Sequence, residues 1–205
     1  MTKFVSLAVL CALFGCAAFA HAQNLDLAVS GSTLWSSKNS TASVGFLPPP
    51  LKGGTFVGGN AQYKWSKHLS FNVEGSVRYH QGIYNAFQPY RPILYDANAV
   101  YTTQYAPKVR GDFMAGIGGE TLLFYSPFGC GIPTGGCRSY IDRTHFLTHL
   151  GAGVRYYLWR NVFLRPEVHW YFVPNNYEFH SDNVFRLGAS LGYTFGPKPQ
   201  KAKAP

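Results

Sequence analysis

Histidines are the side chains best suited to acid–base or metal chemistry in this sequence. Outside the first 22 residues they are His68, His80, His145, His149, His169 and His180. A hydrolase would need one of them beside a serine and oriented by a carboxylate. Glu167 could share inward faces with His149 and His169, but no G-x-S-x-G motif or His-x-Ser pair on a strand supplies the nucleophile. We therefore expect no catalytic residues.

Metal chemistry is also disfavoured by spacing. His145 and His149 are four residues apart, which on a strand separates them by about 13 Å, too far to bind one metal ion directly. Cys130 and Cys137 have six residues between them, and a zinc site would need further Cys or His at ligand spacing. In an exported chain two such cysteines pair by default. We predict a Cys130–Cys137 disulfide, no metal and no cofactor.

Five arginines and four carboxylates fall on the polar side of alternating segments. They are Glu74, Arg78, Arg110, Asp112, Glu120, Arg155, Arg165, Glu167 and Arg186. An isolated buried charge costs several kcal/mol, so an enclosed set of both signs should pair. This predicts a salt-bridged interior, and a narrow anion-selective pore remains the alternative. Arg110-Gly111-Asp112 spells an adhesion triplet, but both charged residues would face inward, so we expect no adhesion through it.

The first residues indicate export. Lys3, the apolar stretch Phe4–Phe14 and Ala20-His21-Ala22 form a signal peptide over residues 1–22. A lipoprotein signal, with Leu13-Phe14-Gly15 before the modified Cys16, is the rival interpretation. Only 13% of residues are charged, and the net charge of +9 forms no clustered basic patch. This excludes nucleic acid and favours anionic lipid head groups as the use of that charge.

Eight segments alternate apolar and polar residues with a period of two, the pattern of strands whose two faces meet different media. The expected strands are Leu25–Thr33, Thr55–Trp65, Leu69–His80, Ala97–Tyr105, Val109–Phe124, Phe146–Leu158, Val162–Phe172 and Asn183–Phe195. Three short turns alternate with four long loops, Trp35–Leu51, Gln81–Asp96, Tyr125–Thr144 and Pro174–Asp182. Pro166 inside one strand predicts a bulge.

This arrangement predicts an all-β fold, an eight-stranded antiparallel up-and-down transmembrane β-barrel with short periplasmic turns and long extracellular loops. The barrel would span residues 23–196, followed by a disordered basic tail at 197–205. Aromatic residues near strand ends would form an interface girdle of Trp65, Tyr79, Trp159, Trp170, Phe172, Tyr193 and Phe195. The aromatic loop around Tyr84, Phe87 and Tyr90 could bind a partner or fold back over the barrel mouth.

The segments Phe163–Val168 and Leu187–Phe195 resemble the small eight-stranded outer-membrane barrels, the family of the outer-membrane protein A transmembrane domain and the opacity-type proteins. The resemblance implies a location in the cell outer membrane, among its lipids. Phe195 resembles the terminal aromatic signal read by the barrel-assembly machinery. We predict a structural or surface-interaction role, with an extracellular ligand possible at the loops. A small pore is the alternative, and a lipid-modifying enzyme the third candidate.

Overall fold

The computed structural model of the chain describes residues 24–36, 51–84, 88–125, 140–176, 178–179 and 181–196. The predicted signal peptide at 1–22, the cysteines Cys130 and Cys137, and the predicted tail at 197–205 lie outside this part. Within it, no helix is long and apolar enough to cross a bilayer.

The described chain is built of antiparallel strands. They are β1 (Leu25–Ser36), β2 (Lys52–Lys64), β3 (Leu69–Arg78), β4 (Gly82–Tyr84), β5 (Gln88–Ala106), β6 (Val109–Tyr125), β7 (Tyr140–Trp159), β8 (Val162–Phe172) and β9 (Asn183–Phe195). Each pairs with its neighbour in the order β3-β2-β1-β9-β8-β7-β6-β5-β4.

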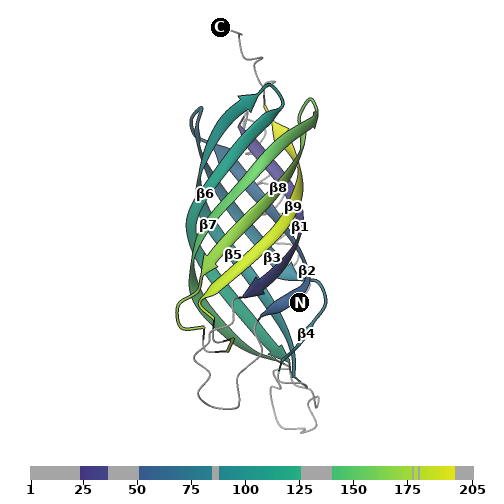
Figure 1. Cartoon of the computed structure of the whole chain (residues 1–205), viewed down its shortest axis with the longest axis vertical. Coiled ribbons are helices and arrows are strands. Elements are labelled where there is room, and N and C mark those ends of the chain that lie inside the picture. The colour runs from purple at the N-terminus through teal and green to yellow at the C-terminus, as the bar shows by residue number, and fades with distance from the viewer. Residues whose placement is uncertain are drawn as a thin grey trace, which may run out of the picture.

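The sheet closes on itself because β3 also pairs with β5, through Leu69↔Tyr101 to Val77↔Ile93. The three-residue β4 extends this seam beyond the end of β3 and pairs with the start of β5. The structure is therefore a closed eight-stranded antiparallel barrel (Figure 1). The predicted fold is confirmed.

The two ends of the barrel differ. One end, at the top of Figure 1, carries the turns at 64–69, 106–109 and 159–162, and we call it the short-turn end. The first and last strands also meet there, where Leu25 pairs with Phe195. The opposite, loop end carries the connections that follow β1, β3, β6 and β8.

The prediction of a loop at Gln81–Asp96 is wrong, because β4 and the first half of β5 lie in this range. Strands β5, β6 and β7 are 19, 17 and 20 residues long, whereas about 9–11 residues cross a bilayer. The same extension shortens the loop predicted at Tyr125–Thr144, since β7 already begins at Tyr140. The barrel wall thus continues beyond the membrane on its loop side.

Pro166 causes no bulge, so that prediction is also wrong. Its partner across β9 is Ala189, in a register that runs without a shift through this region. Toward β7 the ladder pairs Gly153 with Glu167 and then Tyr156 with Leu164, again in one register. Because proline lacks an N–H, ladder pairs are missing between β7 and β8 at this point. The side chains of β8 still alternate between buried and exposed.

The side chains are sorted opposite to those of a soluble protein. Large apolar residues are exposed around the outside, among them Val29 at 67% and Ile117 at 59%. Inward positions of the same strands are polar and buried, including Asn72, Asn98 and Ser190. An apolar exterior around a polar interior is typical of a barrel whose wall faces lipid.

Candidate functional site

Arg155 is the centre of the interior near the short-turn end. Its Nε donates to Asp112 Oδ2 at 2.9 Å, its Nη2 donates to Gln62 Oε1 at 2.9 Å, and its Nη1 pairs with Asp26. Lys64 Nζ donates to the other Asp26 oxygen at 2.8 Å. Arg155 and both carboxylates are at most 1% exposed. These contacts tie together β1, β2, β6 and β7.

A second cluster lies around Arg186, further toward the loop end. The Arg186 guanidinium pairs with Glu74 on β3, and Arg165 Nε donates to Glu167 Oε2 at 2.8 Å within β8. Arg186 Nη2 also lies 3.8 Å from Glu167 Oε1. Arg165 Nη1 lies 3.6 Å from Asp112 Oδ2, which joins this cluster to that of Arg155. Pairing of both signs offsets the cost of burying these charges.

A hydrogen-bonded chain leads from Arg186 across the barrel. Arg186 Nη2 lies 2.8 Å from His169 Nε2, His169 Nδ1 lies 2.8 Å from His149 Nε2, and His149 Nδ1 lies 2.7 Å from Asn98 Oδ1. A guanidinium only donates, so His169 accepts at Nε2 and carries its proton on Nδ1. The same logic puts the proton of His149 on Nδ1, facing Asn98 and, at 3.5 Å, Asp96.

The one group of potential metal ligands in the described residues is Glu74, Glu167 and His169, whose ligand atoms lie within 4.8 Å of one another. The guanidinium of Arg186 approaches all three of these side chains. The positively charged guanidinium of Arg186 thus lies where a metal ion bound by these three residues would have to lie. The arrangement does not fit a metal centre.

The interior also offers little access for catalysis. His149 and His169 are 1% and 0% exposed, and Glu167 is 3% exposed. The serine on Glu167 is Ser190, whose Oγ donates to the carboxylate at 3.2 Å. The hydroxyl therefore contacts the acid and not an imidazole, which is not the geometry of an activated nucleophile.

The nine charged residues predicted for the interior separate into three groups. Six make ion pairs with one another: Glu74, Asp112, Arg155, Arg165, Glu167 and Arg186. Glu120 is buried and accepts a hydrogen bond from Asn176 Nδ2 at 3.2 Å. Arg78 and Arg110 are half-buried and contact tyrosines, with Arg78 Nη1 donating to Tyr90 Oη at 2.8 Å.

Among the interior residues that were not in the predicted set are Asp26, Lys64, Asp96 and Asn98. Asp26 and Lys64 do lie on the polar side of their alternating segments, and this parity could have placed them inside. Asp96 ends the stretch that the sequence predicts as a loop, so that prediction gives it no inward face. Gly116 pairs with Asn98 across the β5–β6 ladder, and a Cβ on Gly116 would collide with the Asn98 side chain.

Apolar side chains fill the barrel at its loop end. We call this cluster the loop-side plug; it comprises Leu34, Leu51, Phe56, Tyr84, Tyr90, Leu94, Leu122, Phe124, Leu147, Tyr171, Val173, Phe179 and Val184. Tyr84 packs edge-on against Phe124 and Phe179, with ring centroids 5.2 and 5.6 Å apart. Tyr84 and Tyr90 thus fold back over the barrel mouth, while Phe87 lies outside the described residues.

The segment between β8 and β9 is fastened over this plug. Tyr84 Oη donates to the carbonyl oxygen of Glu178 at 2.8 Å, and His145 Nε2 lies 2.9 Å from Glu178 Oε2. Asn176 Nδ2 donates to Glu120 Oε2 of β6 at 3.2 Å. Three strands therefore hold the segment that carries Phe179 across the opening.

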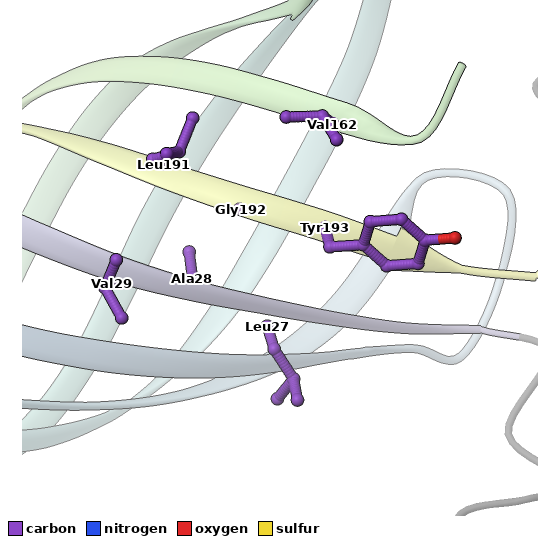
Figure 2. Close-up of a pocket in the computed structure, with 7 residues that line it drawn as sticks. All are labelled: Leu27, Ala28, Val29, Val162, Leu191, Gly192 and Tyr193. Atoms are coloured by element: carbon purple, nitrogen blue, oxygen red, sulfur yellow. The ribbon is translucent and has the colours of Figure 1, made fainter. Parts of the chain in front are cut away.

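The outer surface carries apolar and aromatic side chains without convergent polar groups. All seven residues predicted for the girdle are exposed on it, from Trp170 at 38% to Trp65 at 84%. An apolar groove of about 340 Å³ lies on the outside of β1, β8 and β9 (Figure 2). It is lined by Leu27, Ala28, Val29, Val162, Leu191, Gly192 and Tyr193. Such a lining suits an acyl chain of the bilayer and offers nothing for catalysis.

Solved outer-membrane barrels have the same fold. Neisserial surface protein A matches with a TM-score of 0.60 and 16% identity over 83% of this chain and 97% of that one. The N-terminal β-barrel domain of OprF from Pseudomonas aeruginosa gives 0.50 and 13% over 83% and 98%. Ail, the attachment invasion locus protein of Yersinia pestis, solved with the heparin analogue sucrose octasulfate, gives 0.50 and 12% over 83% and 97%. At these identities the likeness shows the fold alone.

Sequence comparison points the same way. No curated protein matches the chain. The family model of the outer membrane protein beta-barrel domain matches residues 6–195, which include every described strand. Together with the closed barrel and its apolar exterior, this match shows that the chain belongs to the outer membrane protein β-barrel domain family.

Proposed function

We propose that this protein is a closed outer-membrane barrel with a structural or surface-interaction role, and that it does not serve as a diffusion pore. The observation that carries the proposal is the filled interior. Ion pairs around Arg155 and Arg186 cross the interior from near the short-turn end toward the loop end, and the loop-side plug fills the end beyond them. An eight-stranded barrel is just wide enough for side chains to fill it. Family membership supports the outer-membrane location.

The surface role is supported by the start of β7. Residues 140–144 are exposed one after another, so this segment has lost the in–out alternation that marks the rest of the strand. Tyr140 is 42% and Ile141 64% exposed, and Tyr140 lies against Tyr125 with ring centroids 6.2 Å apart. Exposed aromatic residues are enriched at binding surfaces. We therefore assign the projecting ends of β6 and β7 as the contact surface for an extracellular partner.

Two further partners belong to this proposal. The apolar outer faces would contact outer-membrane lipids, with the exposed tryptophans Trp65 and Trp159 beside the short turns. Phe195 ends β9 on the outer surface at 42% exposure, which leaves its ring available to the barrel-assembly machinery during insertion.

Planar-bilayer recording on the purified full chain tests the closed barrel. We expect no conductance above background, under conditions where a large porin conducts. A double variant, Tyr84→Ala with Phe179→Ala, removes two plug side chains but leaves the ion pairs around Arg155 and Arg186 in place, so it should stay silent as well. Ile141→Ala, which truncates an exposed side chain of the same end, should stay silent. Steady conductance by the unaltered protein would contradict the proposal.

A further inference from the structure

A polar cavity of about 290 Å³ lies at the short-turn end of the barrel, at the opposite end from the loop-side plug. Its lining comes from the turn between β2 and β3, which supplies Lys67 and His68, and from inward positions of β5 and β6, which supply Thr102, Gln104 and Arg110. The lining contains two permanent cations, one imidazole, one amide and one hydroxyl, and no carboxylate.

The two cations of the lining are not neutralised by the described residues. Lys67 is exposed and Arg110 half-buried, and neither belongs to any ion pair made by the described carboxylates. The adjacent carboxylate is Asp112, which already accepts from Thr102 Oγ1 at 2.8 Å and from Arg155 Nε at 2.9 Å. The positive charge of the cavity is therefore available to a ligand.

The turns around the cavity strengthen its positive potential. Lys108 and Arg160 are exposed on the other two turns of this end. The acidic residue at the start of β1, Asp26, is buried and engaged by Lys64 and Arg155. A rim of one sign attracts oppositely charged ligands from solution.

The lining is also held in place before any ligand arrives. His68 Nδ1 lies 3.1 Å from the carbonyl oxygen of Thr102, and its ring stacks on Tyr101 at 5.8 Å between centroids. The guanidinium of Arg110 lies over the Tyr157 ring, 5.2 Å from its centroid. Pre-positioned side chains lose less conformational entropy on binding, which favours affinity.

We propose that this cavity binds a small phosphate ester from the aqueous side of the short-turn end. Phosphate oxygens match a guanidinium and an ammonium held at one site. The cavity is close to the lower limit of about 300 Å³ for small-molecule pockets, which leaves room for a short organic group beside the phosphate. Thr102, Gln104 and Arg110 lie on inward strand faces, so the ligand comes from solution and not from the surrounding lipid. This site is independent of the proposed role of the loop end.

Titration of the purified full chain in zwitterionic nanodiscs with glycerol 3-phosphate, followed by calorimetry, tests the site. We expect saturable binding with one ligand per barrel. Arg110→Gln should weaken it at least about tenfold, since one charged hydrogen-bond donor is lost. Arg160→Gln is the matched control, because it removes the same charge from the same rim outside the cavity, and it should leave the dissociation constant within about twofold.

Equal weakening by both variants would mean general attraction to the rim and would overturn the cavity site, as would the absence of binding by the unaltered protein. Heat-modified gel mobility of each variant shows whether it has folded, and Lys67→Gln replaces Arg110→Gln if that variant fails. Repeating the titration in nanodiscs containing phosphatidylglycerol distinguishes a phosphate ester in solution from the phosphate of a lipid head group. Unchanged affinity is expected, whereas competition by the lipid would overturn the assignment to an aqueous ligand.

Discussion

Replacing Arg155 by methionine tests whether the buried ion pairs hold the barrel together. The substitution leaves Asp26 and Asp112 buried without their shared guanidinium. Removing one partner of a buried pair costs about 3–5 kcal/mol. Lys64 still pairs with Asp26 at 2.8 Å, and Arg165 still lies 3.6 Å from Asp112. We therefore expect the lower end, about 3 kcal/mol, or roughly a 100-fold change in the unfolding equilibrium constant.

The assay is reversible urea unfolding in lipid vesicles, followed by tryptophan fluorescence and by heat-modified gel mobility. Arg110→Met is the matched control, because Arg110 contacts Tyr157 and no described carboxylate. We expect it to cost less than about 1 kcal/mol. The double variant, Arg155→Met with Asp112→Asn, should lose less stability than the two single variants lose in sum, since the two residues share one interaction. Equal stability of Arg155→Met and Arg110→Met would refute the reasoning.

Two further substitutions, each with a matched control, probe the wall of the barrel, and all four variants are measured by the same urea unfolding. Gly118→Ala places a Cβ against the carbonyl oxygen of Tyr95 and 2.7 Å from the Asp96 Cβ, so it should cost about 1–3 kcal/mol. Gly31→Ala meets nothing within 4 Å and should stay within about 0.5 kcal/mol; a similar loss at both positions would contradict this close packing. Leu150→Arg puts a charge on the middle of the apolar outer face of β7 and should cost about 2–4 kcal/mol. Asp142→Arg, at the exposed start of the same strand, should cost no more than about 1 kcal/mol, and equal losses would mean that depth in the bilayer does not matter.

Strand identity was readable from sequence wherever one face meets lipid and the other a polar interior. The predicted bounds of β8 and β9 agree with the structure to the residue. Alternation is strong there because Val162 to Phe172 crosses the bilayer along its whole length. At the loop end the inner faces of the strands pack into the apolar plug, as at Tyr90 and Leu94, so the alternation of apolar and polar residues fades there. Pro89 and Pro92 then looked like loop residues, although both lie in β5.

The contacts inside the barrel could be predicted only in part. A residue's place in the alternating pattern of its strand shows whether it faces inward. Which inward residues meet depends on the stagger between strands, and no single segment encodes that stagger. The proximity of His149 and His169 was a possibility from sequence, whereas the pairing of Arg155 with Asp26, from opposite ends of the chain, was not. Phe179 and Leu51 in the plug come from segments without periodicity, so no pattern marked them as buried.

Residue labelling on intact cells tests most directly the central claim that the loop end faces outward. Asp142→Cys and Arg160→Cys, each in a background with Cys130→Ser and Cys137→Ser, place one thiol outside residues 1–22, at exposed positions of opposite ends. A membrane-impermeant maleimide should label the cysteine at 142 on whole cells and the cysteine at 160 only after the outer membrane is opened. Labelling of the cysteine at 160 on intact cells, with protection of the one at 142, would contradict the account.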